Sequence, residues 1–494
     1  MGNRCLALVV VLAGFCGPAV AEEPLSAIDW LSRSVTTPAA APAPDEPEAV
    51  EGALPSDVAV SVLGAPSPDA AGVLPARTSG LPTDLWGLGR TDEIVALIAS
   101  ERNDALPALK GLLLRLLLAE LDPPADAGGR GSLLLARIDK LLDMGALEEA
   151  AALIEAAGAG SAAVFRRRFD VAMLTGTEDT ACAELERKPD LAPTFPARIF
   201  CLARSGDWSA AALSLRTAQA LGYVTDAEDA LLSRFLDPDL YEGEPPLEPP
   251  VPMTPLGWRM LEAIGEGLPT QGLPLAFSHA ELRDTAGWKA QIEAAERLAR
   301  AGVMPPNQLL GIYTARSPAA SGGVWDRVDA FQRFDTAVAA GRAEAVAAQL
   351  PQVWALMAGA ELEVPFAALF AEPVARLGLT GGPGAIAFRM SLLHATYETA
   401  AAARVPADPA EAFLIGIAKG DLSGVPVQGS LARIIAPAFV APDPGPELAE
   451  LVAGDRLGEA ILTAIDRIGR GVQGDLRGVT QGLSLLREVG LEDV

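Results

Sequence analysis

The two histidines are the first residues to consider, because histidine is the commonest acid, base and metal ligand in proteins. They are His279, in LAFSHAELR, and His394, in MSLLHATYE. A zinc site needs three or four clustered ligands, and neither histidine belongs to a His-x-x-x-His or Glu-x-x-His arrangement. We therefore expect each to be a hydrogen-bonded helix residue, and we expect no metal and no other cofactor.

Signatures of other common chemistries are weak. A serine hydrolase would carry Gly-x-Ser-x-Gly at a strand-to-helix turn, and the chain lacks that motif. The glycine-rich residues 322–323 and 381–384 could expose backbone amides to an anion, but no Lys-Ser or Lys-Thr follows them. Any two of the 64 acidic residues could form the carboxylate pair of a glycosidase, without a local signature. The sequence thus predicts no catalytic residue.

The first residues have the three parts of a secretory signal peptide. Arg4 precedes an apolar run over residues 6–15, and Ala19-Val20-Ala21 offers a cleavage site. An uncleaved membrane anchor is the alternative, although the run is shorter than the ~20 residues that a bilayer span needs. We expect residues 1–21 to be removed and the mature chain to be exported to a bacterial periplasm, with no membrane insertion after cleavage.

Export determines how the cysteines are interpreted. Cys5 and Cys16 would leave with the signal peptide, so Cys182 and Cys201 form an even pair in an oxidising compartment. We expect a disulfide between them, with two unpaired buried thiols as the alternative. A redox role is not expected, since the two residues are not arranged as Cys-x-x-Cys.

The net charge of −26 becomes −27 when Arg4 is lost with the signal peptide. Such a surface repels nucleic acid and anionic lipid, which argues against both as partners. It would suit basic partners, and solubility in a crowded envelope is the other explanation.

Residues 194–222 (TFPARIFCLARSGDWSAAALSLRTAQALG) show how the chain is organised. Phe195, Ile199 and Leu202 recur at helical spacing, Gly206 ends that helix, and Asp207 can cap the next. The second apolar stripe consists of Ala211, Leu215, Ala218 and Leu221. Two amphipathic helices joined by so short a turn must lie antiparallel, and the small alanines allow close approach. The segment therefore predicts one helical hairpin.

The hairpin start recurs along the chain. Related segments begin at Gly145, Gly341, Gly454 and Gly474, at irregular intervals. The pattern predicts helices over 91–100, 132–143, 147–157 and 273–283, among others, and no convincing run of alternating strands. The predicted fold class is all-α, with stacked helical hairpins forming an α-solenoid.

Composition divides the chain into segments. Residues 22–90 are rich in Pro, Ala and acidic residues, which predicts a disordered linker. Its two apolar islands, at Trp30-Leu31 and Leu85-Trp86, are candidates for docking on a partner, and folding back on the chain's own domain is equally open.

Two helical blocks follow the linker. The expected blocks are residues 91–237 and 255–494, separated by a Pro-rich connector over 238–254. Thr254 followed by Pro255 is typical of a helix start. A further Pro/Gly-rich connector is expected over 425–446.

The hairpin units GALEEAAALIEAAG (145–158) and GDWSAAALSLRTAQALG (206–222) resemble tetratricopeptide-type repeats. The resemblance covers about residues 130–270, although the spacing is irregular and the aromatic and Pro signature positions are missing. It implies a curved stack of helices that binds another protein. The layout of signal, acidic linker and helical array also resembles that of periplasmic motility proteins that support flagellar stators.

These observations favour a non-enzymatic periplasmic scaffold or adaptor that binds other envelope proteins, with a link to motility implied by the second resemblance. A cell-wall-glycan-processing enzyme or accessory protein is the alternative. Ice binding is a more distant alternative, prompted by the Ala-rich composition, but the threonines are scattered and do not line one face.

Overall fold

The computed structural model describes residues 67–158, 160–471 and 474–493. In these residues the regular structure is helical, and the one β-type contact is an isolated bridge between Leu74 and Ala119. The all-α prediction is confirmed. Among the described helices, none combines the length and apolar character needed to cross a bilayer. The expected signal peptide and the Trp30-Leu31 island lie outside the described residues.

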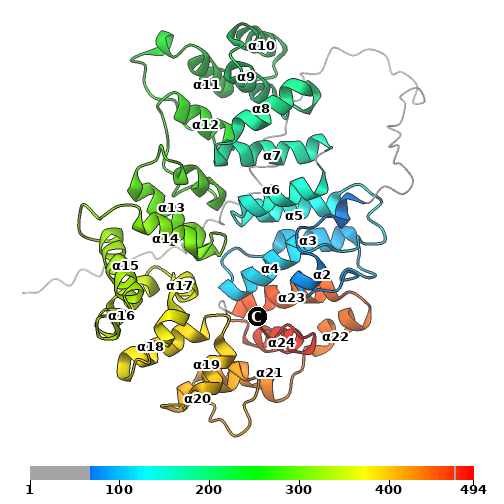
Figure 1. Ribbon diagram of the computed structural model, residues 1–494. Coiled ribbons are helices and arrows are strands. Elements are labelled where there is room, and N and C mark those ends of the chain that lie inside the picture. Colours follow the sequence, from blue (N-terminus) through cyan, green and yellow to red (C-terminus); the bar gives the residue numbers. More distant parts are fainter. Residues whose placement is uncertain (1–66, 159, 472–473, 494) are drawn as a thin grey trace, which may run out of the picture.

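The first half of the chain runs outward from the dark blue helices to the green helices at the top of Figure 1. Most of these helices pack mainly on their neighbours in sequence. The elements are η1 (Pro68–Ala70), α2 (Ala76–Ser79), α3 (Thr91–Ser100), α4 (Pro107–Leu118), α5 (Ser132–Asp143), α6 (Leu147–Ala157), α7 (Ala162–Thr175), α8 (Glu178–Arg187), η2 (Pro189–Leu191), α9 (Phe195–Arg204), α10 (Trp208–Leu221), α11 (Asp226–Leu236) and η3 (Pro238–Tyr241).

The second half returns past the first and ends beside it (Figure 1). Its elements are α12 (Pro255–Ala263), η4 (Leu275–Leu282), α13 (Trp288–Ala301), α14 (Pro306–Thr314), α15 (Val324–Ala339), α16 (Ala343–Ala358), α17 (Glu363–Ala375), α18 (Gly381–Leu392), α19 (Tyr397–Ala403), α20 (Pro409–Ala418), α21 (Ser430–Val440), α22 (Gly445–Ala453), α23 (Leu457–Arg470) and α24 (Leu476–Glu488).

The predicted hairpins are present. Gly206 has φ 88° in the turn between α9 and α10, and Gly145 has φ 76° between α5 and α6. Positive φ favours glycine because a Cβ atom would be strained there. The Asp207 carboxylate accepts a hydrogen bond from Ala210 N at 2.9 Å, so it caps α10 as expected. The stacked hairpins therefore follow from turn chemistry that is visible in the sequence.

The predicted disulfide is also present. Cys182 on α8 is bonded to Cys201 on α9, with 5.0 Å between the Cα atoms. The bond joins neighbouring hairpins of the outward half.

Replacing both residues, as Cys182→Ala with Cys201→Ala, should lower the free energy of unfolding by about 3 kcal/mol. The reason is that the bridge closes the loop between residues 182 and 201 in the unfolded chain and so reduces its conformational entropy. Urea unfolding measures the difference. Reduced wild-type protein should fall to the same stability, whereas a reducing agent should not change the double variant. A double variant as stable as the oxidised wild type would contradict the prediction.

The last helices close on the first ones. Helix α23 packs against α3 and α4, and this contact is referred to here as the joint. Gly458 N donates to Leu85 O at 2.8 Å, and Leu88 N donates to Asp455 O at 2.8 Å. A Cβ atom at Gly458 would lie 2.5 Å from a Trp86 ring carbon, so glycine is required there. The chain forms a closed circuit of helices.

The Leu85-Trp86 island is part of this joint. Each of the two side chains is only 1% exposed. In the described structure the island folds back on its own domain, which is one of the two alternatives that the sequence leaves open. The physical reason is that the Trp86 ring packs against α23 at Gly458, where no side chain blocks it. The sequence pattern around Trp86 does not reveal this contact.

Residues 67–90 belong to the packed body, so the predicted linker is too long at its C-terminal end. The Arg137 guanidinium is 0% exposed and donates to Ala71 O at 2.7 Å, Leu117 O at 2.7 Å and Ala119 O at 2.8 Å. The Asp69 carboxylate accepts from Leu134 N at 2.8 Å. These bonds attach the start of the described chain to α4 and α5.

One hydrophobic core runs from Leu81 to Leu491 and includes residues of both predicted blocks. Helix α7 packs on α12, and α4 packs on α13, so the blocks form one body. Two small clusters, around Phe413 and Phe388, lie apart from this core. The outward and returning halves therefore stabilise each other.

One local prediction is wrong. The expected connector over 425–446 contains α21, whose Ala432, Ala436 and Ala438 are buried. Pro437 lies near the end of that helix, where loss of one backbone hydrogen bond is tolerable. The helix expected over 273–283 is present as the 3₁₀ helix η4.

Candidate binding cavity

The two histidines have structural roles. His279 Nε2 lies 2.7 Å from Gly145 O, and burial lowers the pKa of this imidazole. His394 Nδ1 lies 2.9 Å from Thr396 Oγ1, in the turn that follows α18 and not in a helix as expected. Within the described ranges, no three His, Cys, Asp or Glu side chains are grouped so that they could hold a metal ion.

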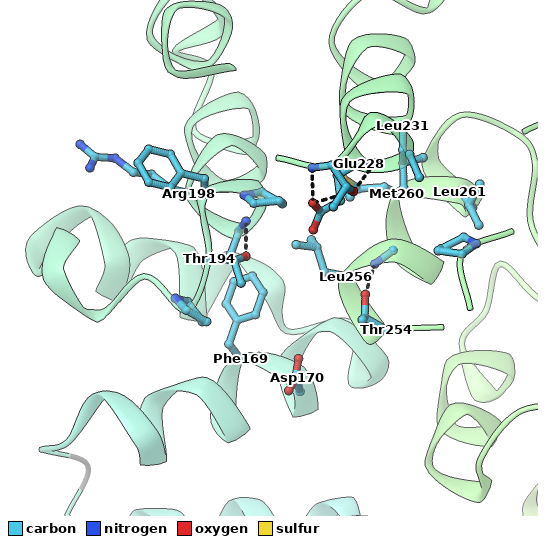
Figure 2. A pocket seen from close by; sticks show the side chains of 18 of the residues that line it. Phe169, Asp170, Thr194, Arg198, Glu228, Leu231, Thr254, Leu256, Met260 and Leu261 are labelled. Carbon is cyan, nitrogen blue, oxygen red and sulfur yellow. Dashed lines mark hydrogen bonds between the residues drawn. The ribbon is translucent and has the colours of Figure 1, made fainter. Parts of the chain in front are cut away.

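A cavity of about 930 Å³ lies between α7, α9, α11, α12 and residues 247–254 (Figure 2). Its apolar wall residues include Phe169, Phe195, Leu231, Leu256, Met260 and Leu261. Its prolines are Pro189, Pro193, Pro196, Pro250 and Pro252. Apolar walls with a few polar groups are typical of ligand-binding sites, and this volume is in their usual range of about 300–1,000 Å³.

Three helices begin at the cavity, and a threonine caps each of them. Thr194 Oγ1 accepts from Ala197 N at 3.2 Å in α9. Thr225 Oγ1 accepts a hydrogen bond from Glu228 N at 3.2 Å in α11. Thr254 Oγ1 accepts one from Gly257 N at 3.0 Å in α12. The caps fix the wall, because each determines where its helix starts.

Aromatic rings form part of the same wall. The rings of Phe195 and Tyr223 stack with 4.8 Å between their centroids and 13° between their planes. Val251, on the opposite connector, is 95% exposed and belongs to the lining. The cavity thus has an exposed apolar margin as well as a buried interior, which suits an extended ligand that enters from solvent.

Asp170 is the buried polar group of the cavity. It lies on α7 beside Phe169, at the lower edge of the cavity in Figure 2, and it is 6% exposed. Its Oδ2 atom has no hydrogen-bond partner. Burial raises the pKa of this carboxyl to about 7, against the attraction of Arg166 and Arg167, while Asp139 raises it further. Asp170 is therefore protonated in a substantial fraction of molecules at neutral pH.

Asp170 should make the protein less stable as the pH rises from about 4 to about 7. The folded chain keeps a proton that the unfolded chain, with its ordinary carboxyl pKa, has already lost, so deprotonation favours unfolding across this window. Asp170→Asn should remove this part of the pH dependence and gain most over wild type near pH 8. Urea unfolding of both proteins at a series of pH values between about 4 and 8 measures the free energy of unfolding. Glu186→Gln, at an exposed position of α8, should keep the wild-type slope. A slope that Asp170→Asn leaves unchanged would contradict the assignment.

A second cavity, of about 430 Å³, lies where α4 meets α13 and the start of α17. Lys110 Nζ donates to Arg300 O at 2.9 Å, and Arg300 Nε donates to Ala360 O at 3.0 Å. Three basic and three acidic side chains line this cavity, so their formal charges cancel. The Lys110 bond connects the two halves of the circuit and the Arg300 bond lies within the returning half, and we assign both a structural role.

Comparison of the chain with protein-family models, with curated proteins and with solved structures found no match.

Local patterns predict the helix start at Thr254 and the hairpin that begins at Thr194, but they do not indicate a cavity between these elements. Asp170, Phe169 and Tyr223 were not singled out, because only the return of the chain brings α12 beside α7. The sequence around an aspartate on a helix does not show whether its carboxyl group will be buried or exposed.

Proposed function

We propose that this protein is an exported, non-enzymatic helical-repeat adaptor, and that it binds an extended apolar segment of another envelope protein in the cavity between α7, α9, α11 and α12. The observation that carries the proposal is the apolar cavity itself, which is built from three separate helix starts and bordered by prolines and aromatic rings. Aromatic-lined grooves are a common way to bind extended, proline-containing segments.

Two further observations support parts of the proposal. The disulfide Cys182–Cys201 fits an oxidising compartment outside the cytoplasm. The net charge of −26 favours a basic partner over an acidic one. The resemblance in layout to periplasmic motility proteins gives a narrower version, in which the partner belongs to the flagellar motor.

A cavity-filling variant tests the proposal. Ala230 lines the cavity from the middle of α11, whereas Ala212 is exposed on α10. Wild-type protein and Ala212→Trp should recover the same partner from envelope extract, and Ala230→Trp should recover at least about tenfold less, since an indole would occupy the space.

Thermal unfolding should confirm that both variants are folded. Equal recovery by both tryptophan variants would contradict binding in the cavity. Turnover of cell-wall glycan by the purified protein would contradict the non-enzymatic assignment.

A further inference from the structure

We infer that the segment bound in the cavity carries a basic side chain, lysine or arginine, and that Asp170 is the residue that recognises it. This inference depends on the proposed function, because it names the chemistry of the partner at that same site.

Asp170 has a buried carboxyl oxygen without a hydrogen-bond partner. The residue is 6% exposed, and its Oδ2 atom has no partner among the described groups of the protein. Buried polar atoms almost always have a hydrogen-bond partner, and leaving one unpaired is unfavourable. A donor supplied by a ligand would remove that cost. Asp170 is therefore the place in the cavity where a bound donor is most favourable.

The charges around Asp170 come from its own helix and from the adjacent ones. Arg166 and Arg167 on α7 attract the carboxylate, and Asp139 on α5 repels it. Arg167 is already bound to Asp139, with Nε 2.5 Å from Oδ1. Of the two other acidic groups in the wall, Glu228 accepts from Thr225 N at 2.8 Å within the cap of α11, and Glu248 is exposed to solvent. Asp170 is thus the buried acidic group of the wall whose role the protein's own hydrogen bonds do not explain.

A basic side chain suits this geometry better than a neutral donor does. Lysine and arginine have long aliphatic stems that pack along apolar walls, here Phe169 and Leu256, while the charged head reaches a carboxylate. Charge-assisted hydrogen bonds are roughly twice as strong as neutral ones. The net charge of −26 also attracts a basic segment over a longer range.

The inference predicts a pH dependence of binding. A cation binds the ionised form of Asp170, so binding below the pKa of about 7 releases a proton and affinity increases as the pH rises. Affinity should level off above that pKa. The affinity for the basic segment should therefore rise with pH, whereas the stability of the free protein should fall. The stability falls because ionisation of Asp170 is unfavourable when no cation is bound.

A library of random peptides about a dozen residues long, displayed on phage, tests the inference without requiring that the natural partner be identified first. The protein is immobilised as wild type, Asp170→Asn and Ala230→Trp. Wild type should enrich apolar peptides that share a lysine or arginine at one position. Asp170→Asn should enrich apolar peptides without that preference, and Ala230→Trp should enrich neither group.

A double-mutant cycle then measures the contact. For a peptide selected on wild type, changing the basic residue to methionine should weaken binding about tenfold on wild type and less than about twofold on Asp170→Asn. An equal loss on both proteins, or selection of apolar peptides without a basic residue on wild type, would overturn the role of Asp170 and leave the cavity as a binding site. Equal enrichment on Ala230→Trp, or no enrichment on wild type, would overturn the proposed function and this inference together.

Discussion

Arg137→Met should lower the free energy of unfolding by about 3–5 kcal/mol, because it removes a fully buried charged group together with its hydrogen bonds to backbone carbonyl oxygens. The guanidinium donates to the carbonyl oxygens of Ala71, Leu117 and Ala119, and these acceptors would be left without their donor. Burial lowers the pKa of Arg137 to about 10, so the group is a cation at neutral pH and methionine does not replace its charge.

Urea unfolding gives the size of the change. Arg216→Met is the matched control, because Arg216 is exposed on α10, and it should change stability by less than about 0.5 kcal/mol. Hydrogen exchange should show the loss first in residues 67–74, which Arg137 attaches to α4 and α5. An Arg137 variant as stable as the control would contradict the role assigned to this side chain.

Trp86→Ala should also cost about 3–5 kcal/mol, since it leaves a large void at the joint. The Trp86 ring packs on Gly458 of α23, and the side chain is 1% exposed. Loss of the ring should increase hydrogen exchange in α3 and α23 together, because each helix covers the other there. Denaturant unfolding and hydrogen exchange on the same sample measure both effects.

Trp208→Ala is the control, because Trp208 is 52% exposed, and its cost should be about 1 kcal/mol or less. If Trp86 were a docking residue, its loss would instead weaken partner binding and leave stability unchanged. That outcome would restore the docking interpretation of the Leu85-Trp86 island.

The sequence predicts local structure where turn chemistry is explicit. The bounds expected for 91–100, 132–143 and 147–157 are those of α3, α5 and α6. Glycines with positive φ, capping residues and apolar stripes act within a few residues, so their effect is readable without the fold. The pairing of Cys182 with Cys201 follows for a related reason, since each lies on one of two successive helices.

The joint and the cavity depend on contacts between distant parts of the chain. Gly458 and Trp86 are far apart in sequence, and nothing in either segment indicates that one accepts the other. The cavity likewise requires α12 to return beside α7. Residues 425–446 show the opposite kind of error, in which a helix is present where the prolines and glycines predict a connector. Burial of the alanines of α21 stabilises this helix by more than the hydrogen bond lost at Pro437 costs.

Closure of the circuit gives the cavity a fixed shape. Its walls come from the outward half, through α7, α9 and α11, and from the returning half, through α12. Arg259 Nε on α12 lies 3.1 Å from Glu178 Oε1 on α8, which holds the two halves together beside the cavity. A preformed site loses less conformational entropy on binding than a flexible one.

Site-specific photocrosslinking in living cells tests the binding cavity most directly. A benzophenone amino acid replaces Val251 at the exposed margin of the cavity or Ala212 on the exposed face of α10, and the crosslinked peptides are mapped by mass spectrometry. We predict an adduct from position 251 alone, mapped to one extended apolar segment of an envelope protein that contains a lysine or arginine. Absence of an adduct from position 251, or the same adduct from both positions, would contradict binding in the cavity.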